Sequence, residues 1–189
     1  MRELSLHLLD IAENSVNAKA GNVEILVSED TRTDRLRMTI QDDGVGMDAE
    51  TVARVTDPFV TSRTTRKVGL GLPFLKMAAE SCNGYLSVQS QKGVGTRVDV
   101  EFRLSHIDRM PLGDLTSTIL SLVIGFPQVH WTFTYLGNGN EFIFDDRPVK
   151  EELEGISLCE PEVLQCLREM ISEGIQANQP VSQISNLQS

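Results

Sequence analysis

The residue best suited to chemistry in this 189-residue chain is an aspartate that follows a run of alternating apolar and polar side chains. Residues 35–41 alternate apolar and polar side chains, which predicts a half-buried strand ending at Asp42. A carboxylate at a strand end can accept a hydrogen bond from an exocyclic amine. The glycines that follow, Gly44 and Gly46, remove side chains where a flat base could lie against backbone or where φ must be positive. This segment is therefore suited to hold the base of a purine nucleotide.

A second set of polar residues lies upstream, in a predicted helix over residues 3–18. His7, Asp10, Asn14 and Asn17 recur every three or four residues, so they share one face of this helix. Exposed helix faces usually mix lysine and glutamate, whereas this one offers carboxylate and amide oxygens, which suit a metal ion and water. His7 could orient Asp10 or contact phosphate, or it could cap the helix or lie in solvent.

A glycine-rich turn, Gly69 to Gly71, precedes the next predicted helix, over residues 70–81. Free amides and the positive dipole end of a helix start can bind phosphate, and glycine lets the phosphate come close. A Thr/Ser-rich segment with three cationic side chains comes just before this turn, and we expect it to form a phosphate-facing lid. The residues predicted to face the phosphates are Thr61, Ser62, Arg63, Arg66, Lys67, Gly69, Leu70, Gly71 and Leu72.

The order of these motifs resembles the GHKL superfamily of ATPases, which includes DNA gyrase B, Hsp90, sensor histidine kinases and MutL. The resemblance covers Leu4 to Leu104 and fades beyond it. The matching segments, in order, are Asp10–Asn14, Asp42–Gly46, Asp57–Ser62, Gly69–Leu72 and Gly93–Thr96. A single glycine motif is weak evidence, but their order and spacing together are specific.

This resemblance implies a site for ATP and Mg²⁺. It assigns Asn14 to the Mg²⁺ ion, Asp42 to the adenine amine, Thr96 to support of the adenine, and Asp10 to the general base that polarises the attacking water. The nucleotide contacts that it implies besides the phosphate-facing set are Asn14, Asn17, Asp42, Gly44, Gly46, Met47 and Thr96.

The sequence departs from the ATPase members of the superfamily at the position of the general base. Those members carry glutamate there, whereas Asp10 is one methylene shorter. The shorter side chain therefore favours slow hydrolysis or a switch that holds ATP. Glu13 is a second choice, because it lies about 100° around the helix from Asn14.

The resemblance implies an α+β fold, a two-layer α/β sandwich of the Bergerat type with a mixed sheet and helices on one face. We expect residues 1–104 to form this histidine-kinase-like ATP-binding domain. Its other predicted elements are strands 22–28, 85–90 and 96–104 and a short helix from Asp48 to Val55.

Beyond Leu104 the pattern changes, and residues 105–175 are predicted to form a small helix–hairpin–helix module. Its elements are helix 113–126, strands 128–136 and 141–144, and helix 161–175. The stripe of Trp131, Phe133 and Tyr135 is interpreted as core. The last helix could pack on the hairpin or on another subunit, which leaves a homodimer open. Residues 176–189 are rich in Gln, Asn and Ser, which predicts disorder.

The composition favours a cytoplasmic protein. A net charge of −10 argues against binding to nucleic acid or to anionic lipid, and 40% hydrophobic residues suffice for a core. The longest apolar run is too short to cross a membrane, so no membrane insertion is expected. The three cysteines lack metal-ligand spacing and are expected to be reduced thiols.

Three functions remain open at this stage. The first is a regulatory or signalling ATPase in which Mg-ATP orders the lid and changes contacts with a protein partner. The second is a protein kinase of the histidine-kinase or anti-sigma-factor serine-kinase type that acts on another protein. The third is a non-catalytic nucleotide sensor. His106 and His130 lie outside the matched motifs, which disfavours self-phosphorylation.

Overall fold

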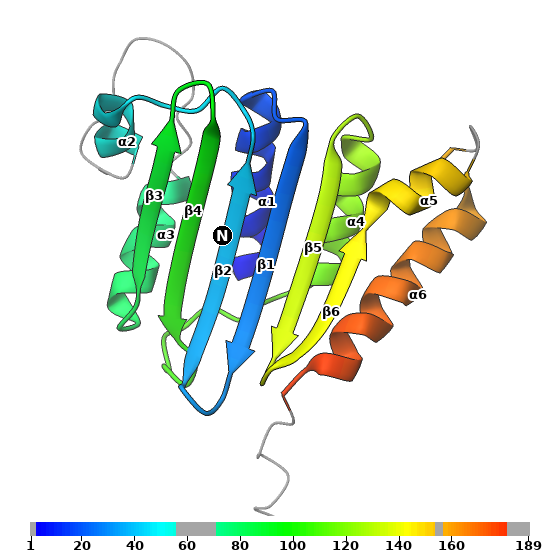
Figure 1. The fold of residues 1–189 in the computed structure, drawn as a ribbon. Helices are drawn as coiled ribbons and strands as arrows, with labels where there is room; N and C mark the ends of the chain where they lie inside the picture. Colours follow the sequence, from blue (N-terminus) through cyan, green and yellow to red (C-terminus); the bar gives the residue numbers. More distant parts are fainter. Residues whose placement is uncertain (1–2, 56–70, 154–156, 181–189) are drawn as a thin grey trace, which may run out of the picture.

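Six strands form one twisted sheet with helices packed on one of its faces (Figure 1). The computed structural model describes residues 3–55, 71–153 and 157–180. The elements run in the order α1 (Leu4–Asn17), β1 (Asn22–Asp30), β2 (Arg35–Asp42), α2 (Ala49–Val55), α3 (Gly71–Ser81), β3 (Tyr85–Gln91), β4 (Gly95–Arg103), α4 (Leu115–Gly125), β5 (His130–Gly137), β6 (Asn140–Asp145), α5 (Asp146–Glu152) and α6 (Pro161–Asn178). The sheet order is β3-β4-β2-β1-β5-β6.

The sheet is mixed, because β1 and β5 are parallel while the other neighbouring strands are antiparallel. In the register of the central strands, Asp42 of β2 lies opposite Thr96 of β4, and Thr96 lies opposite Ser90 of β3. Directly opposed residues place their side chains on the same face. These three polar side chains therefore form a row across the end of the sheet.

The core lies between the sheet and the layer of α1, α3 and α4 (Figure 1). Alternate residues of the central strands β1 and β2 are buried there, as the period of two predicts: Val23, Ile25 and Val27 on β1, and Leu36, Met38 and Ile40 on β2. The prediction of an α+β two-layer sandwich with helices on one face is confirmed.

The elements of residues 105–175 extend this sheet and share its core. Strand β5 pairs with β1 along its whole length, and Trp131, Phe133 and Tyr135 are buried, so the interpretation of this stripe as core is confirmed. Helix α6 packs on β5, β6 and α4. The hairpin is therefore continuous with the sheet formed by β1 to β4, while a domain boundary after Leu104 remains a prediction.

Two details of this region differ from the sequence-based prediction. Helix α5 was missed, although Asp145 caps it by accepting a hydrogen bond from the Arg147 amide and Pro148 lies in its first turn. Helix α6 continues to Asn178, three residues beyond its predicted end at Ile175, because Ile171 and Ile175 hold its last turns in the core. Residues 181–189 lie outside the described part of the chain.

Trp131 provides a test of the shared core. Its side chain is 1% exposed, and its indole N–H donates to the Phe126 carbonyl. Trp131→Ala should lower the free energy of unfolding by about 3–5 kcal/mol, since it leaves a large cavity. Urea denaturation followed by far-UV circular dichroism measures this. Ile143→Ala on the same hairpin, where the side chain is 55% exposed, is the control. Equal effects of the two substitutions would contradict a core that includes the hairpin.

Candidate nucleotide-binding site

The carboxylate of Asp42 is held by donors from three separate segments. Its Oδ1 accepts hydrogen bonds from the Gly44 amide at 2.9 Å and the Thr96 amide at 3.2 Å. Its Oδ2 accepts a 2.7 Å hydrogen bond from the Ser15 hydroxyl of α1. Both lone pairs of Oδ1 are thus engaged, whereas Oδ2 retains one for a ligand.

A cavity of about 410 Å³ opens beside this carboxylate. Its walls come from α1, the end of β2, the turn after it, α2, the first turn of α3, and strands β3 and β4. Most of the lining is apolar, which suits the faces of a base. The lining residues are Ile11, Asn14, Ser15, Asn17, Ala18, Ile40, Asp42, Val45, Gly46, Met47, Thr51, Val55, Leu72, Val88, Thr96 and Val98.

A serine ties the turn after β2 to the neighbouring strands. The Ser90 hydroxyl accepts from the Met47 amide at 2.8 Å, donates to the Gly95 carbonyl at 2.9 Å, and lies 2.8 Å from the Thr96 hydroxyl. These contacts fix the backbone of the turn against β3 and β4. The turn and the Thr96 hydroxyl therefore form one hydrogen-bonded unit beside the cavity.

Two glycines of the turn are required by space and by backbone conformation. A side chain on Gly44 would meet the Ala18 carbonyl, which accepts a hydrogen bond from Val45. Gly46 has φ +63°, and a Cβ there would overlap the Gln91 backbone. Both glycines allow the turn to close against α1 and β3.

The polar face of α1 divides between the cavity and the start of α3. Asn14 and Asn17 line the cavity and are exposed. Asp10, one turn earlier, is half-buried and lies against Gly71, where any side chain on Gly71 would overlap its carboxylate. Asp10, the proposed general base, thus lies beside the first residue of α3, next to the cavity but outside its lining.

His7 is buried, with 4% of its surface exposed, so the alternative of a solvated histidine is wrong. It is not the cap of α1 either, because Glu3 occupies that position. Burial lowers the pKa of its imidazole, helped by the N-terminal charge and opposed by Asp10.

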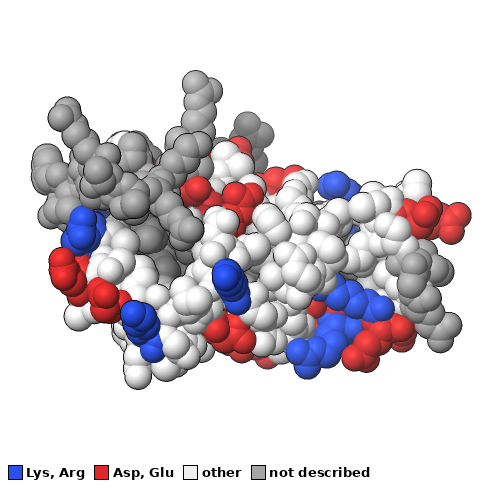
Figure 2. All heavy atoms as spheres, turned by 90° about the horizontal axis from the view of Figure 1, so that it is seen from above, with Lys and Arg blue, Asp and Glu red and all other residues white. Residues whose placement is uncertain are grey.

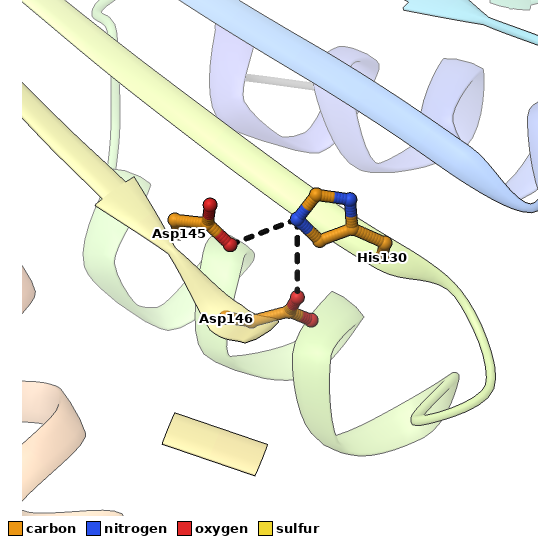
Figure 3. Close-up of side chains that lie close together, drawn as sticks. All are labelled: His130, Asp145 and Asp146. Atoms are coloured by element: carbon orange, nitrogen blue, oxygen red, sulfur yellow. Dashed lines mark hydrogen bonds and ion pairs between the residues drawn. The ribbon is translucent and has the colours of Figure 1, made fainter. Parts of the chain in front are cut away.

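A second polar cluster lies at the same end of the sheet (Figure 3). The His130 ring nitrogen Nε2 lies 2.8 Å from Asp145 and 3.9 Å from the buried Asp146. Lys150 pairs with Asp146 at 2.5 Å, and Arg147 lies 2.8 Å from His130 Nδ1. Because Lys150 already balances the buried Asp146 and the other contacts are hydrogen bonds through His130, the cluster is an ion-pair and hydrogen-bond network that fixes α5 to the hairpin. From above, basic and acidic side chains lie side by side at the α5 end (Figure 2).

Comparison with known proteins identifies the fold and the family. The family model described as "Histidine kinase-, DNA gyrase B-, and HSP90-like ATPase" matches residues 2–106, more than half of the chain. The chain belongs to this family.

Curated relatives of this family member include sensor proteins. It is 26% identical over 57% of its length to a putative sensor histidine kinase NtrY-like of Rickettsia conorii, and 30% identical over 57% to a putative sensor protein of Shewanella frigidimarina. It is 38% identical over 47% of its length to the sensor protein kinase FleS of Pseudomonas aeruginosa. The matches cover 18%, 17% and 22% of these relatives, so the chain spans less than a quarter of their length.

Solved structures show the same fold over more of the chain. The MutL ATPase domain of Aquifex aeolicus complexed with ADP superimposes with a TM-score of 0.51 at 18% identity and covers 87% of this chain and 70% of that one. The N-terminal domain of a DNA repair protein gives a TM-score of 0.53 at 15% identity and covers 76% and 52%. The likeness to MutL thus includes the region after Leu104 in part. Within the described ranges, no helix has the length and hydropathy needed to cross a membrane.

The predicted site residues fall into three groups. The cavity brings together Asn14, Asn17, Asp42, Gly46, Met47, Leu72 and Thr96. Asp10, Gly44 and Gly71 lie beside it, and Thr61, Ser62, Arg63, Arg66, Lys67, Gly69 and Leu70 lie outside the described residues. The sequence did not point to Ser15 or Ser90, because one hydroxyl in a helix or strand carries no signal until the pairing of strands is known.

The hydrogen bonds of Asp42 predict how Asp42→Asn changes the affinity for ATP. The two backbone amides on Oδ1 require the asparagine oxygen there, which turns its NH₂ group toward Ser15 and the cavity. A donor then faces the adenine amine, and ATP affinity should fall at least about tenfold.

Titration calorimetry with Mg-ATP measures this affinity. Asp43→Asn is the matched control, because Asp43 accepts from the Gly21 and Asn22 amides away from the cavity. If the Asp42 variant binds ATP as tightly as the wild type, the adenine assignment is wrong.

The buried imidazole of His7 predicts a pH dependence of stability. Its folded pKa lies below the ordinary value of 6.5, so its contribution is complete above that value and is lost as the pH falls through the lowered pKa. The melting temperature should therefore fall on acidification from neutral pH, and His7→Gln should reduce this fall. The partly exposed His106, as His106→Gln, is the control. The same pH profile in wild type and His7→Gln would contradict a titrating buried His7.

Proposed function

We propose that the chain is a Mg-ATP-binding regulatory or signalling ATPase of the histidine-kinase-like type, in which bound ATP changes contacts with a protein partner and slow hydrolysis resets the site. The single observation that carries this proposal is the Asp42 carboxylate, which faces the mostly apolar cavity with one lone pair left for a ligand. Membership of the ATPase family supports ATP as that ligand.

The residues around the cavity divide the work of binding. Asp42 would accept a hydrogen bond from the adenine amine, while the apolar walls exclude water from the base. The phosphates would extend toward the start of α3, where Gly71 lacks a side chain and where the first amides of a helix have no partner within the helix. Asn14 is exposed at the cavity and its amide oxygen would hold Mg²⁺, which supplies charge neutralisation at the phosphates.

Asp10 is the group proposed to activate water. It lies against Gly71, at the helix start proposed for the phosphates, so its carboxylate is in the correct region for a general base. Because its side chain is one methylene shorter than that of glutamate, the proposed hydrolysis is slow. The same proposal includes a lid over Thr61 to Lys67, a protein partner, a homodimer and a cytoplasmic setting.

A protein kinase that acts on a separate protein is the second candidate. Its support is the set of relatives named as sensor kinases. A sensor without catalysis is the third. The fate of the γ-phosphate of labelled ATP, with the chain alone and with cell extract, distinguishes them. Free phosphate supports the ATPase, labelled protein supports the kinase, and unchanged ATP supports the sensor.

Variants of the α1 face separate binding from chemistry. Asp10→Asn should retain ATP affinity and lower turnover about 100-fold or more, because a general base acts on water and contributes little to ground-state binding. Asn14→Ala should weaken binding of Mg-ATP itself. Calorimetry and phosphate release measure the two effects. Wild-type turnover in Asp10→Asn, with loss of turnover in Glu13→Gln, would mean that the other carboxylate is the base.

A further inference from the structure

We propose that Ser90 determines the base preference of this site by holding the Thr96 hydroxyl as a hydrogen-bond acceptor toward the ligand. This inference rests on the proposed function, because it concerns the base of the bound nucleotide. Ser90 does not line the cavity. It is therefore a positioning residue that acts through Thr96.

The direction of the hydrogen bonds around Ser90 follows from counting its hydrogens. A serine hydroxyl has one hydrogen and two lone pairs. The Met47 amide can only donate to it and the Gly95 carbonyl can only accept from it. Its one hydrogen therefore points to Gly95, and its remaining lone pair must accept from the Thr96 hydroxyl at 2.8 Å. This is the assignment that satisfies all three contacts.

Thr96 then offers only lone pairs to a ligand. Its hydrogen is directed to Ser90, and Thr96 is among the residues that line the cavity. The neighbouring carboxylate of Asp42 is also acceptor-only, and the Ser15 hydroxyl donates its one hydrogen to Oδ2. The side chains of Asp42, Thr96 and Ser15 are thus acceptors without a free hydrogen.

An acceptor-only row selects a donor on the base. The 6-amino group of adenine supplies two N–H donors, whereas hypoxanthine carries a carbonyl oxygen at the same position and a hydrogen on the adjacent N1. Oxygen facing the lone pairs of Asp42 and Thr96 leaves buried acceptors unpaired, which is the mismatch that binding sites reject most strongly. ATP and inosine triphosphate differ only along this edge, in the 6-substituent and the N1 hydrogen, so they are the matched pair of probes.

Loss of Ser90 should relax this selection. In Ser90→Ala the Thr96 hydroxyl is free to rotate and donate to the inosine carbonyl. The ratio of ATP to inosine triphosphate affinity should fall about tenfold, the factor that corresponds to one hydrogen bond. A purely structural role for Ser90 in holding the turn would weaken both nucleotides equally and leave the ratio unchanged. Ser87→Ala, on the same strand but lining the open face of the sheet, should keep the wild-type ratio.

Calorimetry with both Mg-nucleotides on the full chain provides the test, with a thermal melt to verify folding. If Ser90→Ala does not fold, Thr96→Val replaces it. Removal of the Thr96 acceptor should weaken the binding of ATP and leave the affinity for inosine triphosphate unchanged. Two results would overturn the role of Ser90 while ATP binding stands. One is a selective wild type whose ratio of ATP to inosine triphosphate affinity is unchanged in Ser90→Ala. The other is an equal loss of affinity for both nucleotides in Thr96→Val. A wild type that binds neither nucleotide overturns the proposed function itself.

Discussion

The position of one carboxylate connects the parts of this molecule. Asp42 at the end of β2 receives donors from α1, from its own turn and from β4, so the helix layer, the turn and the sheet meet at its two oxygens. Each of these hydrogen bonds to a charged acceptor is stronger than one between neutral groups. A carboxylate held by three donors keeps its direction when the ligand is absent, and the remaining lone pair is available to a ligand in the cavity that Asp42 lines.

The region after Leu104 supports this end of the sheet from the other side. Strand β5 pairs with β1, whose first residue, Asn22, donates to Asp43 at 2.6 Å. The ring of His130 at the start of β5 lies 3.1 Å from the Asn22 side-chain oxygen. The residue next to Asp42 is thus connected through Asn22 to the ion-pair network of α5, so the hairpin buttresses the loop that follows β2.

Much of the fold was accessible from the sequence because its signals are local. The alternation of Leu36, Met38 and Ile40 and the stripe of α1 need only the period of a strand or helix, and both gave elements whose ends differ by a residue or two. The pairing of β5 with β1 was not accessible, since it joins residues that are more than 100 positions apart. Ser15 and Ser90 were missed for the same reason: their partners are set by packing and register rather than by neighbours in the chain.

The most direct test of the central claim is a crystal structure of the chain with Mg²⁺ and a non-hydrolysable ATP analogue. In that structure the adenine amine should donate to Asp42 Oδ2, the oxygen that also accepts from Ser15, while Oδ1 keeps its bonds to the Gly44 and Thr96 amides. An analogue bound with its base outside the cavity, or with Asp42 facing the phosphates or the ribose, would contradict the claim.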